Sequence, residues 1–194
     1  MIYNKMTNFF KYLTYITIAG FLSLAISICG TFLYLAPNLP NVDSLLDIKL
    51  QVPLRIYTSD AELIGEFGDK RRTPVDIEHV PETFKQAFLA AEDDLFYEHN
   101  GISYKGLGRA IFQMVTGAAQ QTGGSTITQQ VAKNYFLTPE RKITRKLREI
   151  FLSLQIEAEL TKDQILELYV NKIFLGHRSY GISAAAQVYY GKKI

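Results

Sequence analysis

The fold is decided by residues 81–101, which read PETFKQAFLAAEDDLFYEHNG. Apolar side chains recur there at the 3.6-residue period of an α-helix, at Phe84, Ala87, Phe88, Ala91 and Leu95. Pro81 stands where a helix can begin, because the first turn has no use for its missing N–H. Gly101 is a typical stop signal. These residues predict one amphipathic helix that opens at Pro81 and ends before Gly101.

Two more helices are indicated on the C-terminal side. A second apolar stripe recurs with helical period at Leu147, Ile150, Phe151, Leu154 and Ala158. Leu152 and Ile156 occupy the opposite face, and a helix that is apolar on both faces is usually buried. Thr161 and Gln164 form a capping box that opens the next helix, which runs toward Asn171.

Other segments lack this helical pattern. Residues 106–119 are apolar but contain three glycines, so we expect a loose and mobile segment there. Residues 54–58 and 62–67 are extended in pattern and are separated by Ser59 and Asp60, which predicts a β-hairpin. The sequence therefore predicts a mostly α fold with a small β element.

The N-terminal segment predicts a membrane anchor. Residues 12–36 carry no charge and exceed the about 20 residues that a helix needs to cross a bilayer. A cleavable signal peptide is the alternative. The apolar core of a signal peptide spans only about 7–15 residues and is closely followed by a small-residue cleavage site, whereas the run here is longer and no such site follows it closely. Lys5 and Lys11 precede the span, and the first acidic residue is Asp43. By the positive-inside rule, the N-terminus is cytoplasmic and the chain after residue 36 lies outside.

These observations divide the chain into four parts. We expect a cytoplasmic N-terminus at residues 1–11, a transmembrane anchor at 12–36, a stalk with the small β element at 37–80, and one helical domain at 81–194. A chain of 194 residues has room for one compact domain beside an anchor.

Composition narrows the range of partners. Apolar residues make up 47% and charged residues 21%, which is ordinary for a globular protein with one membrane segment. The net charge of +2 is too small to indicate nucleic-acid binding, and we expect no nucleic-acid partner. Cys29 is the single cysteine, so an intrachain disulfide and a cysteine-based metal site are excluded.

Glu92 is the first candidate for a catalytic residue. On the predicted helix it flanks the apolar stripe and neighbours Phe88 and Phe96, four residues away on either side. A carboxylate held against aromatic surface loses solvation and gains affinity for a proton, as a general base requires. A solvated glutamate at the edge of the helix is the alternative. Asp93 and Asp94 suggest an Asp-x-Asp metal site only weakly, because adjacent residues point to different helix faces.

Glu149 is the second candidate. It lies beside Leu152 and Ile156 on the predicted buried helix, with Arg145 four residues and Lys146 three residues before it. A glutamate on an apolar face next to two cations is an unusual environment. The alternative is an ordinary i,i+4 ion pair, worth about 0.2–0.5 kcal/mol. Spacing alone does not decide between the two.

A polar segment and a basic cluster complete the set. Residues 123–130 read GGSTITQQ and are followed by Lys133 and Asn134, so glycines, hydroxyls, amides and a charge stand together. Such a run suits sugar hydroxyls or a phosphate, although a polar loop with a helix N-cap explains it as well. A basic cluster follows at Arg141, Lys142, Arg145, Lys146 and Arg148. It could hold a pyrophosphate or anionic lipid heads, and a solvated basic face is the alternative.

These segments carry a resemblance to a known family. Residues 92–101 resemble the Glu-Asp-x-x-Phe-x-x-His-x-Gly signature of peptidoglycan glycosyltransferases. Four further segments are similar to that family's other signatures in the same order, at residues 123–130, 145–149, 162–171 and 181–192. The last has Tyr190 where Phe is expected. Residues 53–81 resemble the bifunctional class A penicillin-binding proteins rather than the shorter monofunctional enzymes.

The resemblance implies a fold, an activity and a location. The fold would be a lysozyme-like glycosyltransferase domain after one transmembrane helix. The activity would be polymerisation of lipid II, a disaccharide-peptide on an isoprenoid pyrophosphate, into β-1,4 glycan strands with inversion at the anomeric carbon. Partners would be lipid II, the growing strand, membrane lipid and other cell-wall synthesis proteins. The chain would sit in the bacterial inner membrane as a single-pass protein, with its catalytic domain on the periplasmic side.

The resemblance also implies roles for individual residues. Glu92 would be the base that accepts the proton of the attacking hydroxyl. Lys146 and Arg141, with Lys133 nearby, would stabilise the pyrophosphate leaving group. Glu149 would orient these cations or help to hold a divalent ion, Mg²⁺ or Mn²⁺, and no set of metal ligands is assigned. Donor sugar and phosphate would be bound by Ser125, Thr126, Gln129, Gln130 and Asn134.

The sequence departs from the class A pattern at its C-terminal side. It ends at Ile194, directly after the fifth signature, and contains no Ser-x-x-Lys. We therefore expect this chain to lack the last helices of the glycosyltransferase domain and the transpeptidase domain. Two alternatives follow: a non-catalytic membrane-anchored fragment or interaction module, and a lysozyme-like glycan hydrolase. The hydrolase needs neither the cation cluster nor the anchor.

Overall fold

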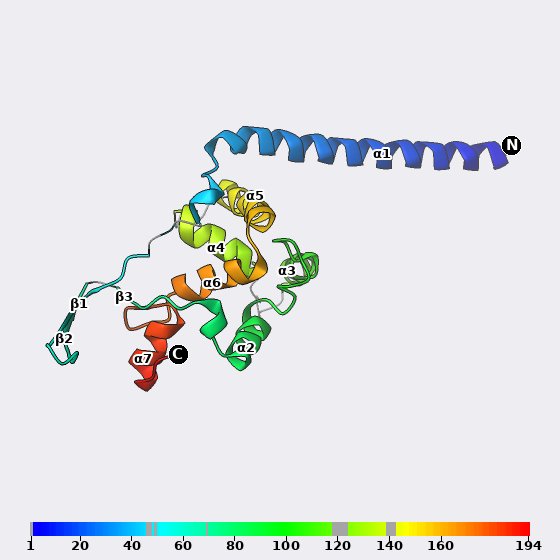
Figure 1. The fold of residues 1–194 in the computed structure, drawn as a ribbon. Helices are drawn as coiled ribbons and strands as arrows, with labels where there is room; N and C mark the ends of the chain where they lie inside the picture. Colours follow the sequence, from blue (N-terminus) through cyan, green and yellow to red (C-terminus); the bar gives the residue numbers. More distant parts are fainter. Residues whose placement is uncertain (1, 46–47, 49, 69, 118–123, 139–142) are drawn as a thin grey trace. The chain divides into compact units, whose positions relative to one another are not determined.

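The computed structural model describes residues 2–45, 48, 50–68, 70–117, 124–138 and 143–194 (Figure 1). It divides into two units, Met1–Pro40 and Asn41–Ile194, and each is described by itself. The α-helices are α1 Ile2–Leu35, α2 Glu82–Glu92, α3 Tyr104–Thr116, α4 Ile127–Phe136, α5 Ile143–Glu159, α6 Lys162–Lys172 and α7 Ile182–Tyr190. Short 3-10 helices lie at Ala36–Asn38, Val42–Leu45 and Ile77–His79. The described residues are thus mostly helical, as predicted.

The first unit contains the long apolar helix α1. Its segment Asn8–Leu35 has a mean hydropathy of 2.1 over its most apolar window, and by length and composition it can cross a membrane. The α-helix ends at Leu35, and the 3-10 helix Ala36–Asn38 follows with Pro37 near its start. A proline in that place removes a helical hydrogen bond, which explains the end of α1 one residue before the predicted one.

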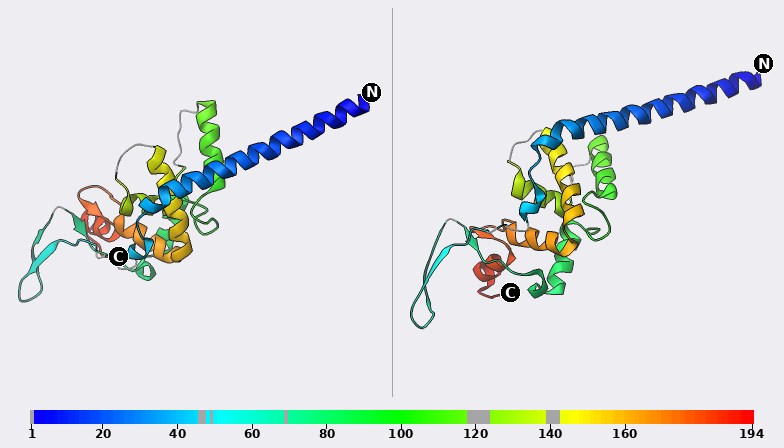
Figure 2. Two further views of the ribbon diagram at one scale, coloured as in Figure 1. Left: turned by 90° about the horizontal axis from the view of Figure 1, so that it is seen from above. Right: turned by 45° about the horizontal axis from the view of Figure 1, so that its top comes forward.

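The predicted hairpin is confirmed. Strands β1 (Leu54–Tyr57) and β2 (Leu63–Phe67) pair antiparallel, with Leu54 opposite Phe67 and an irregularity in register after Ile56. In the views of Figures 1 and 2 the hairpin extends away from the helices of its unit. A second small sheet joins β3 (Arg71–Arg72) to β4 (Ser179–Tyr180) in parallel.

The core of the second unit lies where α4, α5 and α6 pack together (Figure 1). Ile127 of α4, Leu152 and Ile156 of α5 and Leu166 of α6 have no exposed surface. Full burial of such a side chain contributes about 1.5–3 kcal/mol to folding. The capping box of Thr161 and Gln164 begins α6 as predicted.

The buried face of α5 is not the one with the longer apolar stripe. Glu149, Leu152, Ser153 and Ile156 are buried, whereas Leu154 of the predicted stripe is 42% exposed. Gly101 approaches this face closely, since a Cβ at that position would stand 2.9 Å from the Ser153 carbonyl oxygen. The face of α5 that fits against the neighbouring segment around Gly101 is therefore buried, although it has fewer apolar residues.

Two predicted segments differ in the structure. Helix α2 ends at Glu92, well before Gly101, and the residues between them form turns. The segment predicted to be loose contains α3, so that prediction is wrong about its conformation. Ser103 caps α3 by accepting a hydrogen bond from the Gly106 N–H at 3.1 Å, and Gly117 closes it with a left-handed φ of 65°. These caps offset the about 1 kcal/mol that each internal glycine costs relative to alanine.

Candidate active site

Glu92 lies at the last position of α2 and reaches the first turn of α4. The Gln130 amide donates to Glu92 Oε2 at 2.9 Å, and the Tyr169 hydroxyl donates to Gln130 Oε1 at 3.1 Å. Burial raises the pKa of Tyr169, and the charge of Glu92 raises it further, so Tyr169 stays a neutral donor. The Glu92 carboxylate is thus positioned by a chain of two hydrogen bonds from α4 and α6.

The environment predicted for Glu92 is wrong. Because α2 ends at this residue, Phe96 is not one helical turn further on. Phe96 is 1% exposed and belongs to the core, whereas the Glu92 side chain is exposed. The structure agrees with the alternative of a solvated glutamate. Its role as base stays a prediction that rests on position and motif, not on burial.

Asp93 explains why α2 ends there. Its backbone leaves the helical region with φ −160° and ψ 80°, and the residue is 7% exposed. Its carboxylate accepts hydrogen bonds from the Ile127 N–H and from His99 Nε2, both at 3.0 Å. A carboxylate at a helix N-terminus is stabilised by the free N–H groups and the helix dipole. Asp93 therefore fixes the end of α2 beside the start of α4. Among the described residues, Asp93 and Asp94 do not belong to a group of three side chains that could hold a metal ion.

Thr126 is the N-cap of α4. Its hydroxyl accepts from the Gln129 N–H at 3.2 Å and donates to the Gly101 carbonyl at 2.7 Å. Thr126 is 2% exposed, so its hydroxyl serves the fold in this structure. The predicted contact of Thr126 with substrate stays untested.

Lys146 and the buried Glu149 form a charge cluster against the same turn of α4. The Lys146 ammonium donates to Ser125 Oγ at 2.8 Å and to Gln129 Oε1 at 3.1 Å, and it also pairs with Glu149 Oε1. Arg145 donates to Glu149 Oε2 at 2.8 Å. The Glu149 side chain is 3% exposed. The i,i+4 ion pair therefore exists, and its carboxylate is buried while the side chains of Arg145 and Lys146 remain 23% and 41% exposed.

The geometry of Glu149 bears on the proposed divalent ion. Each of its carboxylate oxygens accepts a hydrogen bond from a cation, Oε2 from Arg145 and Oε1 from Lys146. In the part of the chain that the structure describes, no group of three His, Cys, Asp or Glu side chains could hold an ion. Glu149 thus fits the role of orienting Lys146, and a divalent ion at the pyrophosphate stays a prediction.

The other predicted binding residues lie further along α4 or outside the described chain. Lys133 is exposed and Asn134 is half-buried, three and four residues after Gln130, so all three share one side of the helix. Arg141 lies outside the described residues. The structure therefore brings Glu92, Lys146 and the polar residues of α4 together around one helix, and it does not place Arg141.

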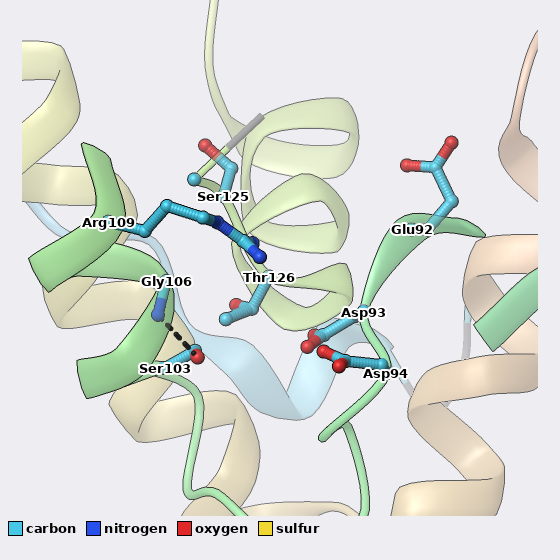
Figure 3. Close-up of a pocket in the computed structure, with 9 residues that line it drawn as sticks. Glu92, Asp93, Asp94, Ser103, Gly106, Arg109, Ser125 and Thr126 are labelled. Carbon is cyan, nitrogen blue, oxygen red and sulfur yellow. Dashed lines mark hydrogen bonds between the residues drawn. The ribbon is translucent and has the colours of Figure 1, made fainter. Parts of the chain in front are cut away.

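Sequence reasoning missed Arg109. A pocket next to Glu92 is lined by Glu92, Asp93, Asp94, Ser103, Gly106, Arg109, Gly124, Ser125 and Thr126. Figure 3 shows the Arg109 side chain extending from α3 across this pocket toward Thr126. The available signal was that Arg109 is the only charged residue of the apolar residues 106–119. No neighbours could be assigned to it, because the segment was expected to be loose rather than helical.

Asp93→Asn is expected to destabilise the protein, because an amide cannot replace the charge that both of its donors contact. The expected loss is about 1–3 kcal/mol, which lowers the thermal midpoint by about 2–4 °C per kcal/mol. Asp94→Asn is the matched control, since Asp94 is the exposed neighbour and should change stability by less than about 0.5 kcal/mol. Equal midpoints for the two variants, measured by circular dichroism, would show that Asp93 does not hold this junction.

Comparison with known proteins identifies the family. Residues 60–194 match the family model described as Transglycosylase. The chain is 54% identical over 184 residues to penicillin-binding protein 1A of Pseudomonas aeruginosa, covering 95% of this chain and 22% of that protein. It is 48% identical over 187 residues to penicillin-binding protein 1A of Escherichia coli K12, covering 96% of this chain and 22% of that protein.

A solved structure is also similar. The crystal structure of penicillin-binding protein 1A from Haemophilus influenzae is 32% identical, with 75% of this chain and 12% of that chain covered and a TM-score of 0.32. This chain thus spans about a fifth of the length of the curated relatives, 22% in the two named above. The match over residues 60–194 covers most of the sequence and shows that the chain belongs to the transglycosylase family.

Proposed function

We propose that this chain carries the polymerising site of a peptidoglycan glycosyltransferase that joins lipid II into β-1,4 glycan strands with inversion. One observation supports this most. Adjacent residues of α4 hold a carboxylate and an ammonium group, because Gln130 contacts Glu92 and Gln129 contacts Lys146. Transfer of a sugar from a pyrophosphate donor requires a base and a cation, and here the two groups lie on either side of one helix turn.

The reaction would be a single displacement. The acceptor's 4-hydroxyl oxygen bonds to the anomeric carbon of the donor while the bond from that carbon to the pyrophosphate oxygen breaks. Glu92 takes the hydroxyl proton, and the electron pair leaves with the pyrophosphate. One displacement inverts the configuration at carbon, which is why no covalent sugar–enzyme bond is needed.

Lys146 would act on the leaving group. In the structure its ammonium contacts a hydroxyl and an amide oxygen, Ser125 Oγ and Gln129 Oε1, and both are weaker acceptors than a phosphate. The buried Glu149 keeps Lys146 in place while the phosphate charge develops. Arg109 lines the pocket beside Glu92 together with Ser125, which accepts a hydrogen bond from Lys146, and would supply a second positive charge. Donor sugar and phosphate are proposed to be bound by Ser125, Thr126, Gln129, Gln130 and Asn134, with Lys133 near the leaving group.

One assay separates the proposal from its alternatives. The chain, and a longer protein that contains it, are incubated with labelled lipid II, and the products are separated by size. Polymer supports the proposal, released disaccharide indicates a lysozyme-like hydrolase, and unchanged lipid II from both proteins indicates a non-catalytic module. The cation cluster around Lys146 argues against a lysozyme-like hydrolase, because such an enzyme cleaves the bond between two sugars, and its leaving group is a sugar oxygen that needs a proton from an acid rather than a cluster of cations.

The proposed location is a bacterial inner membrane, with the helical unit on the outer side. It follows from the long apolar helix α1 and from Lys5 and Lys11, which precede the uncharged residues 12–36. A reporter that works only outside the cytoplasm should be active when it is fused after residue 60. Activity of a strictly cytoplasmic reporter at the same position would reverse the proposed orientation.

A further inference from the structure

Three cations converge at the end of α4 opposite to Glu92. The parallel pairing of β3 and β4 sets Arg72 beside Tyr180, and the Arg72 guanidinium carbon lies 5.3 Å from the centre of the Tyr180 ring. Lys70 lies 5.4 Å from the centre of the same ring. The Lys172 ammonium, in the last turn of α6, lies 4.4 Å from the centre of the Tyr135 ring of α4. Aromatic faces hold cations in this way but do not neutralise them.

The positive charges are incompletely compensated. Arg72 is 4% exposed, and its buried Nε–H has no hydrogen-bond partner. Its Nη1 reaches only the Gln51 carbonyl, at 3.4 Å. Among the described residues, no carboxylate forms an ion pair with Lys70, Arg72 or Lys172. A buried guanidinium with an idle donor is unfavourable unless an anion completes it.

The two most enclosed cations also act on each other. Burial lowers the pKa of Lys172, and the charges of Arg72 and Lys70 lower it further. Burial likewise lowers the pKa of Arg72. The nearby carboxylate of Glu167 accepts a hydrogen bond from the Ile77 N–H at 2.9 Å, so it is engaged elsewhere. An anion bound among the three cations would remove this repulsion.

We propose that Lys70, Arg72 and Lys172 bind a phosphate group at a site separate from the pocket beside Glu92. The edge of a guanidinium presents parallel N–H donors that match two phosphate oxygens, and the two ammonium groups supply further charge. Three positive charges favour a phosphate over a singly charged carboxylate. A hollow lined by Gln51, Val52, Pro53, Phe67, Gly68 and Lys70 opens beside the cluster and gives an ion access to it.

The phosphate could be a free ion or part of a lipid headgroup, and the experiment separates these sources. The full chain is held in neutral detergent micelles, and the Arg72 Nε–H signal is followed by ¹⁵N NMR, assigned with Arg72→Lys. Inorganic phosphate is added at constant ionic strength in one series. Phosphatidylglycerol is added in the other, with phosphatidylcholine as its reference. A saturable shift in either series supports the site and names its source.

Variants provide the second measurement. Lys172→Met should weaken the binding at least about tenfold, because it removes one charge-assisted hydrogen bond. Lys85→Met is the matched control, since Lys85 is also half-buried but pairs with Glu82 on α2 at 3.0 Å. If Lys172→Met does not fold, the exposed Lys70→Met takes its place. No saturable shift with either phosphate source, or equal affinity in the Lys172 variant and the control, would overturn the proposal.

Discussion

Glu92→Gln is expected to lower the rate of glycan polymerisation at least a hundredfold. A positioned base typically contributes about 10²–10⁴-fold, and glutamine keeps the shape but cannot accept the proton. Affinity for a donor-site ligand should survive, because the base acts on the acceptor's hydroxyl. The glutamine carbonyl can still accept the hydrogen bond that Gln130 gives to Glu92. Polymerisation of labelled lipid II and donor-ligand affinity are measured in a purified protein that contains this chain.

Glu98→Gln is the control, since Glu98 is an exposed glutamate of the same signature segment. A fall in rate of less than about tenfold, below the usual contribution of a base, would rule out Glu92 as the base. A joint fall of rate, affinity and melting temperature would instead assign Glu92 to the structure, through its contact with α4.

Lys146→Ala is expected to reduce turnover about a hundredfold and donor affinity much less. Charge on the leaving oxygen is largest in the transition state, so a cation placed there stabilises that state more than the bound donor. The measurement is kcat and KM for lipid II, with the melting temperature taken in parallel, because Glu149 would keep only Arg145 as a partner. An unchanged kcat with a raised KM would assign Lys146 to uniform binding.

Two further variants separate charge from packing in this test. Lys146→Arg retains the positive charge and should keep more activity than alanine. Lys85→Ala removes a half-buried lysine from α2 and should leave kcat and KM unchanged.

Local signals were sufficient for much of the fold. The capping box of Thr161 and Gln164 and the hairpin at β1 and β2 depend on residues close in sequence, and both were predicted correctly. The end of α2 depends instead on the contact of Asp93 with Ile127, which lies 34 residues further on. No periodicity within residues 81–101 contains that information, and the predicted helix was therefore too long.

The difference between local and long-range information also holds for the site. Glu149 was recognised from its neighbours in one helix, and its two ion partners, Arg145 and Lys146, are those that the spacing indicated. The exposure of Glu92 could not be predicted, because it depends on where α2 ends. Arg109 can be placed in the site only if α3 is a helix, and the glycines of that segment argued against a helix.

The hydrogen bond from Thr126 to the Gly101 carbonyl has a consequence for the tolerance of this protein to changes in length. It holds Gly101 and Thr126 together at 2.7 Å, although the two residues lie 25 positions apart in the sequence. Doubling the length of the chain between two residues held together in this way costs only about 0.6 kcal/mol of closure entropy. Added or removed residues between Gly101 and Thr126 are therefore expected to leave Glu92 in place relative to α4. Gly101 itself cannot be replaced so easily, because a Cβ there would stand 2.9 Å from the Ser153 carbonyl oxygen.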